Sequence, residues 1–154
     1  MKSLLLIVSL FFAVVLHAQD ENSKVVVPTL KVVKEFQKDF PKVKAVWRTD
    51  YAGADSDQLC YEGDFVVNEI NMTAVYSAIG IFKVLEIEIK PAEIPAKASS
   101  YLAKNYPKNK INKAARMMTN TNNITYEIGI TLNDKSTDAV FNKEGDFLRM
   151  VQKD

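Results

Sequence analysis

The sequence predicts an α+β fold in which two tandem repeats, each of one helix followed by an antiparallel meander of about four strands, pack as one domain. Two short segments carry apolar residues at helical spacing, the stretches after them switch to the alternation of strands, and the two halves of the chain resemble each other. One short helix cannot cover the apolar face of a whole meander, so we expect the two units to share a core.

The first predicted helix covers residues 28–39. Pro28 suits a first helical turn and Pro41 ends the helix, because proline lacks the backbone N–H that a helix interior needs. Apolar residues repeat at the spacing of one helix face: Leu30, Val33, Phe36 and Phe40. We expect these residues to face the core.

The second predicted helix covers residues 95–105 and follows the same design. Tyr106 and Pro107 close it as Phe40 and Pro41 close the first. Its expected inward residues are Ala98, Tyr101 and Leu102.

Alternating side chains predict strands after each helix. In the second half the apolar members are Ile124, Tyr126, Ile128, Ile130 and Leu132. In the first half Leu59, Tyr61, Phe65 and Val67 point one way, whereas Cys60, Glu62 and Asp64 point to a wetter face. Turn residues at 120–123, 133–134 and 143–145 separate the strands.

The two halves align when the chain is shifted by 65 residues, and seven of 24 positions from Leu59 to Phe82 are then identical. Chance would give roughly one or two matches at ordinary composition. We therefore expect repeats at residues 28–90 and 91–154, joined by a stiff connector that contains Pro91 and Pro95.

The first residues predict export. Lys2 precedes a nearly uninterrupted apolar run over residues 4–16, which is too short for a membrane helix, and a small residue, Ala18, follows. We expect cleavage after Ala18, a flexible N-terminus over residues 19–27, no membrane insertion after cleavage, and a periplasmic or secreted protein.

Composition excludes several classes of chemistry. The one histidine, His17, leaves with the signal, and Cys60 is the one cysteine, so zinc sites and histidine-activated nucleophiles lack their residues. Loss of Lys2 leaves equal numbers of acidic and basic residues, which gives no reason to expect a nucleic acid partner. We expect no cofactor, no metal and no catalytic residues.

The order of motifs resembles the PepSY-like family of bacterial envelope proteins, which in turn resembles β-lactamase inhibitory protein. The residues that carry the resemblance, from about Pro28 to Val151, are Phe40–Pro41, Trp47, Ala74–Val75–Tyr76, Gly80–Ile81–Phe82, Ile94–Pro95, Tyr106–Pro107, Ala139–Val140–Phe141 and Gly145–Asp146–Phe147. The resemblance implies a non-catalytic envelope module that binds a protein partner of unknown identity, and it raises inhibition of an envelope or secreted enzyme as one role. Alternatives are a carboxylate-based hydrolase and a module that senses a small molecule or calcium.

The candidate partner-binding residues lie in and beside the longest loop of the first half: Trp47, Tyr51, Asp55 and Asp57. An exposed acidic loop next to aromatic residues suits recognition or weak calcium binding, although a solvated turn and a core tryptophan are the simpler interpretations. Glu62 and Glu127 occupy equivalent positions, but we expect them to face outward in a structural role. Cys60 and the lysines around Tyr106 are expected to be an unreactive thiol and a solvated surface.

Overall fold

The computed structural model describes residues 26–52 and 58–152. Its first half contains the helix α1 (Leu30–Asp39) and the strands β1 (Val46–Ala52), β2 (Gln58–Val67), β3 (Ile70–Ser77) and β4 (Phe82–Glu88). A short 3-10 helix, η1 (Pro91–Glu93), leads to the helix α2 (Ala96–Asn105). The strands β5 (Ile111–Thr119), β6 (Ile124–Leu132), β7 (Lys135–Asn142) and β8 (Phe147–Gln152) follow.

The strands form one continuous antiparallel sheet of eight strands in chain order, β1 to β8. The prediction of two tandem repeats, each of one helix followed by its own meander and packed as one domain, is therefore wrong, although the α+β class remains compatible. β4 pairs directly with β5, from Val84 opposite Thr119 to Glu88 opposite Ala115. Without this pairing, β4 and β5 would each be a free sheet edge with unpaired backbone N–H and C=O groups. Joining the edges satisfies these groups, so the two halves form one sheet and not two stacked sheets.

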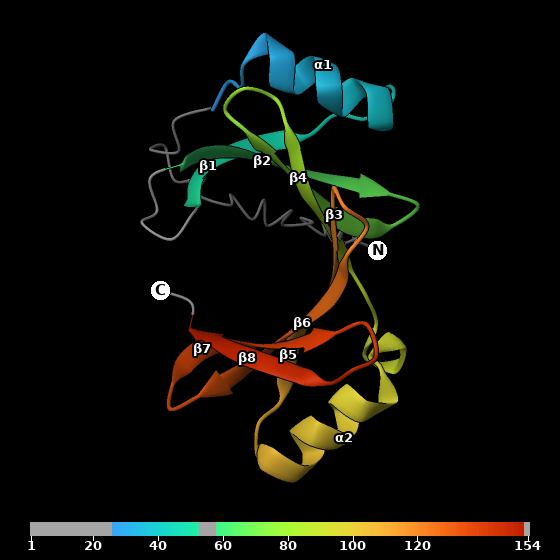
Figure 1. Ribbon diagram of the computed structural model, residues 1–154, viewed down its shortest axis with the longest axis vertical. Coiled ribbons are helices and arrows are strands. Elements are labelled where there is room, and N and C mark those ends of the chain that lie inside the picture. The colour runs from blue at the N-terminus through green and yellow to red at the C-terminus, as the bar shows by residue number, and fades with distance from the viewer. Residues whose placement is uncertain (1–25, 53–57, 153–154) are drawn as a thin grey trace, which may run out of the picture.

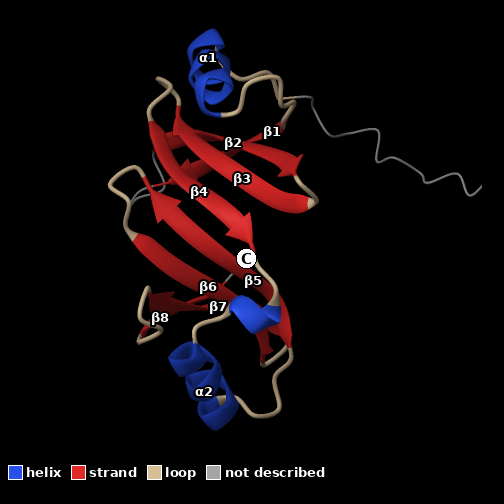
Figure 2. Ribbon diagram, turned by 90° about the vertical axis from the view of Figure 1, so that its right-hand side faces the viewer, coloured by secondary structure: helices blue, strands red, loops and turns tan. Residues whose placement is uncertain are grey.

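The sheet is curved, and both helices lie on the same side of it. Figure 1 shows the strands bent into a C shape, with α1 outside one arm and α2 outside the other. We call the helix-bearing side the outer face and the concave side the inner face. Figure 2 looks onto the outer face, where the middle strands cross between the two helices.

Each helix buries its own apolar cluster, which corrects the expectation of one shared core. Val32 and Phe36 of α1 pack on Phe65, Ala74 and Tyr76. The second cluster joins α2 to β5, β6 and β7, and its buried members are Ile94, Ala98, Leu102, Ala114, Ile128, Ala139 and Phe141. The two clusters sit at opposite ends of the outer face, because the curvature of the sheet carries its arms apart.

The α1 helix confirms the predicted segment but not every inward residue. Thr29 caps it, with its hydroxyl accepting from the backbone N–H of Val32 at 3.3 Å. Val32 and Phe36 are buried, whereas Leu30 is 88% exposed, so its assignment to the core is wrong. The helix begins at Leu30, and the side chain of this first residue is not covered by the sheet.

Tight turns seat the helices on the sheet. Gly80 and Gly145 have φ angles of 81° and 84°, a region that favours glycine. A Cβ atom at Gly80 would lie 2.9 Å from the Lys31 side chain, and one at Gly145 would lie 2.8 Å from Pro95. Both glycines therefore allow a turn of the sheet to touch the start of a helix. Within the described ranges, no helix has the length and apolarity to cross a membrane.

Candidate binding surface

Exposed apolar side chains gather where α1 begins and where β1 and β3 end. Of the ten exposed large apolar residues in the described part of the chain, five lie there, with exposures between 49% and 88%. They are Val27, Leu30, Tyr51, Ile79 and Ile81, and we call them the tip patch. Scattered apolar side chains are normal on a surface, but a contiguous group marks a place where contact with another molecule is favourable.

Backbone and side-chain contacts hold the parts of the tip patch together. The hydroxyl of Thr29, before α1, donates to the carbonyl of Ala78 in the turn after β3, at 3.4 Å. The N–H of Ala78 donates in turn to the carbonyl of Leu59 at 3.1 Å, and Leu59 is the cross-strand partner of Tyr51. Three segments distant in sequence therefore meet at one end of the molecule.

The structure separates the two aromatic residues that the sequence placed in one site. Trp47 and Tyr51 share the outer face of β1, four residues apart on a strand. Trp47 lies under α1, with its ring edge-on to Phe36 at a centroid distance of 5.4 Å, and it contributes to packing. Tyr51 is exposed and belongs to the tip patch. Asp55 and Asp57 lie outside the described residues, so their role in binding stays a prediction.

Charged side chains border the tip patch. Lys31 and Lys34 are exposed on α1, beside Leu30, and Lys83 is exposed at the start of β4. Asp50 precedes Tyr51, and its carboxylate accepts from the Tyr51 backbone N–H at 2.7 Å. A mixed polar rim around an apolar centre is the usual composition of a protein interface.

The inner face carries charged pairs. Arg48 of β1 bonds Glu62 at 2.6 Å, and its guanidinium also pairs with Asp64. Burial acts to lower the pKa of Arg48, but the neighbouring carboxylates Glu62 and Asp64 outweigh it and raise that pKa. Lys113 and Glu86 form a second pair at 2.5 Å.

The carboxylates considered as an acid and base pair are not brought together. Glu62 lies on β2 and Glu127 on β6, so three strands separate them, and Glu62 is engaged by Arg48. A glycosidase pair faces one substrate from either side of a bond, about 5 to 10 Å apart. In the described part of the chain, moreover, no three potential metal ligands from cysteine, histidine, aspartate and glutamate cluster together.

Cys60 differs from the expectation of an exposed thiol. Its side chain points to the inner face as predicted, yet it is buried. Burial is the largest influence and raises the pKa of Cys60. Lys83 acts against it, and Glu62 and Asp50, each with a weaker influence than Lys83, raise the pKa further. The thiol is held in its neutral, less nucleophilic form, which agrees with the predicted low reactivity.

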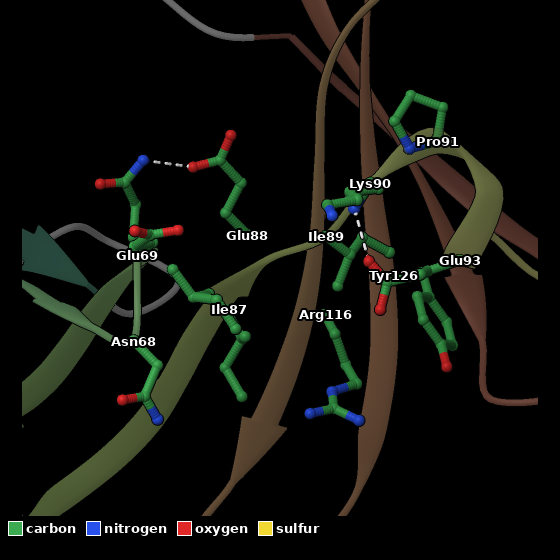
Figure 3. A pocket seen from close by; sticks show the side chains of 12 residues that line it. Asn68, Glu69, Ile87, Glu88, Ile89, Lys90, Pro91, Glu93, Arg116 and Tyr126 are labelled. Atoms are coloured by element: carbon green, nitrogen blue, oxygen red, sulfur yellow. Dashed lines mark hydrogen bonds between the residues drawn. The ribbon is translucent and has the colours of Figure 1, made fainter.

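A groove lies between the turn after β2, the end of β4, η1 and the neighbouring strands β5 and β6, and we call it the waist groove. Its volume is about 740 Å³, and its lining includes Ile87, Glu88, Ile89, Arg116 and Tyr126. Figure 3 shows these side chains together with Asn68 and Glu69 from the turn after β2 and with Glu93 from η1. No local sequence pattern predicts this site, because its residues come from four separate segments. The signal in the sequence that could have revealed it is Arg116. It is a charged residue that alternates with Ala114 and Met118, and so shares with them the side of the strand that faces the helices.

Comparison with known proteins shows a fold shared with proteins of Bacteroides. No protein-family model matches the sequence, and no curated protein matches it. A candidate periplasmic protein of Bacteroides eggerthii is 14% identical, with 82% of this chain and 90% of that chain aligned and a TM-score of 0.69. A DUF2874 family protein of Bacteroides uniformis is 12% identical, with the same two coverages and a TM-score of 0.68.

A BLIP-like protein of Bacteroides fragilis is also similar, with 13% identity, 86% of this chain and 92% of that chain aligned, and a TM-score of 0.62. The resemblance stated from the sequence is thus supported at the level of a BLIP-like fold. The predicted periplasmic location agrees with the description of the Bacteroides eggerthii protein. Identities this low carry the fold and not the activity.

Proposed function

We propose that this chain is a non-catalytic module of the bacterial periplasm that binds a protein partner through the tip patch. The observation that carries the proposal is the gathering of half of the exposed large apolar residues of the described chain at one end of the sheet. Leaving such a patch in water has a free-energy cost that a partner would remove by covering it.

Tyr51 is the proposed anchor of that interface. Tyrosine combines a large apolar ring with a hydroxyl that can bond at a wet rim, and it is enriched among the residues that dominate binding energy. Ile79 and Ile81 supply apolar area from the turn after β3, which contacts Thr29 and Lys31 on either side of Leu30. The lysines and Asp50 at the border would select a partner with complementary charges.

The family and the kind of partner are finer parts of the same proposal. Membership of the PepSY-like family is supported by the motif order, and inhibition of an envelope or secreted enzyme is supported by the likeness to a BLIP-like protein. The absence of catalysis is supported by the separation of Glu62 from Glu127.

Site-specific photocrosslinking in living cells tests the proposed interface. A photoreactive phenylalanine analogue would replace Tyr51 in one variant and Ile79 in another, and a third variant would carry it at Leu148. Leu148 is a matched control because it is an exposed apolar residue on β8, outside the tip patch. We expect positions 51 and 79 to capture the same partner and position 148 to capture none of it.

The captured partner then permits a direct binding measurement. The double variant Tyr51→Ser with Ile79→Ser should weaken binding by about tenfold or more, since anchor residues dominate interfaces, while the melting temperature stays nearly unchanged. If position 148 captured the partner and the double variant bound it normally, the tip patch would not be the interface. If the purified partner is an enzyme and this protein leaves its activity unchanged, the inhibitor role is excluded, but binding through the tip patch is not.

A further inference from the structure

A single row of cross-strand neighbours crosses the outer face beneath both helices and the waist groove. Its members are paired in order along the sheet: Phe65, Met72, Ile87, Arg116, Tyr126, Phe141 and Phe147. Side chains paired in this way share one face and touch. Phe65, Met72 and Ile87 belong to the α1 cluster, and Tyr126, Phe141 and Phe147 belong to the α2 cluster. Arg116 is the one charged member, and it lies between the clusters.

The Arg116 guanidinium is available to a ligand. Across the described ranges, no carboxylate oxygen lies within ion-pair distance of it. Three glutamates line the groove. Glu69 lies in the turn after β2, Glu88 accepts from the Asn71 side chain at 2.5 Å, and Glu93 accepts from the Lys90 backbone N–H at 2.8 Å. Figure 3 shows the guanidinium pointing away from the carboxylates of Glu88 and Glu93.

The walls beside Arg116 are apolar and aromatic. Ile87 and Tyr126 are its direct neighbours in the row, and Ile89 continues the apolar wall toward η1. These three side chains are half-buried, so each still exposes part of its apolar surface to the groove. A guanidinium beside such walls suits a ligand with an apolar body and an anionic end.

We propose that the waist groove binds a carboxylate-bearing ligand with an apolar body, whose carboxylate is held by Arg116. Arginine presents parallel N–H donors that match the two oxygens of a carboxylate. The ligand is either the free C-terminus of a peptide or a small organic acid, because both offer the same group. A volume of about 740 Å³ accommodates a short peptide end or a compact acid.

This site is independent of the proposed protein interface. The tip patch lies at the end of β2 near Leu59, and the waist groove is bordered by Asn68 and Glu69, beyond the opposite end of that strand. Failure of one proposal therefore leaves the other intact.

Nuclear magnetic resonance of the arginine side chains gives a direct test. The chain has three arginines, Arg48, Arg116 and Arg149, so the Nε–H signals can be assigned from single variants. The probes are N-acetyl-Ala-Leu-Ala with a free carboxylate, the same peptide as its C-terminal amide, and hexanoate, each at millimolar concentration. We expect the free-acid peptide or hexanoate to shift the Arg116 signal, while the amide does not.

Two variants connect the signal to the site. Arg116→Gln should weaken binding of the responding acid by about ten- to a hundredfold, as loss of a charge-assisted bidentate contact does. Arg149→Gln is the matched control, because Arg149 is exposed and its cross-strand partner is Val140, on the inner face. This variant should bind the acid as tightly as the wild type does. A response to the peptide acid alone identifies a peptide terminus, and a response to hexanoate alone identifies a small acid. No shift of Arg116 with either acid, an equal shift with the amide, or unchanged binding by Arg116→Gln would overturn the proposal.

Discussion

Tyr76 places a hydroxyl in the α1 cluster where it has no hydrogen-bond partner. Its side chain is fully buried beneath Phe36, Trp47 and Phe82, and its Oη atom is the one unpartnered buried side-chain polar atom in the described part of the chain. Burial raises the pKa of Tyr76, and Asp39 and Glu35 raise it further, so the hydroxyl stays neutral. A buried polar group without a partner has an unfavourable desolvation energy.

Tyr76→Phe is therefore expected to stabilise the protein. Removing the hydroxyl deletes the desolvation penalty and keeps the ring contacts, so the free energy of unfolding should rise by about 1 kcal/mol. Urea unfolding measures the change, with Tyr126→Phe as a control whose half-buried ring should give little difference. A loss of stability in Tyr76→Phe would show that the hydroxyl has a favourable partner, such as a bound water.

Asp146 is a second residue with a defined energetic role, because it ties the last turn of the sheet to α2. Its carboxylate accepts from Lys97 of α2 at 2.9 Å and from the Asn142 side chain at 3.3 Å. The bond from Lys97 is the larger influence and the bond from Asn142 the next, and both lower the pKa of Asp146 below its usual 3.8. A carboxylate with a lowered folded pKa stabilises the fold above its unfolded pKa, and that contribution is lost as pH falls through the folded value.

Asp146→Asn should accordingly weaken the acid dependence of stability. As the pH falls below 3.8, the melting temperature of the wild type should decline more than that of the variant, and the difference between them should narrow. Glu144→Gln, in the same turn, is the control. If the melting temperatures of the wild type and of Asp146→Asn fell in parallel over this pH range, Lys97 would not favour the ionised form of the Asp146 carboxylate.

The helices and several strands follow from local sequence patterns. The α2 segment was predicted over residues 95–105 and is observed at Ala96–Asn105, and the alternation from Ile124 to Leu132 matches β6. Their periods are strong because each element has one apolar face. Leu30 was wrongly assigned to the core, because an apolar residue at the first position of a helix fits the periodic pattern whether or not the sheet covers it.

The joining of the two halves could not be predicted from local patterns. The direct pairing of β4 with β5 depends on backbone edges whose N–H and C=O groups carry no residue-specific signal. The candidate site shows the same limit. Tyr51 was predicted, but its neighbours Leu30 and Ile79 come from segments that only the fold brings together. The position of Arg116 between the two helix-covered clusters likewise follows from the fold and not from the local sequence.

The whole molecule combines one continuous ladder of backbone hydrogen bonds with two separate apolar clusters. The clusters share no residue, but the strands at the junction contribute across it: Met118 of β5 packs on the α1 cluster, and Ile89, directly after β4, packs on the α2 cluster. Side-chain burial therefore stabilises each arm of the sheet mainly by itself, and the pairing of β4 with β5 connects the arms. Cooperative units of a protein tend to coincide with such clusters.

Loss of one cluster should then loosen one arm before the other. Phe36→Ala removes a fully buried ring from the α1 cluster, at a cost of about 3 to 5 kcal/mol. We expect amide hydrogens of β2 and β3 to exchange faster in this variant, while those of β6 and β7 stay protected to higher urea. Phe141→Ala, which removes an equally buried ring from the α2 cluster, should show the reverse order. Equal loss of protection in both arms of either variant would mean that the β4–β5 ladder couples the halves into a single cooperative unit, in spite of their separate clusters.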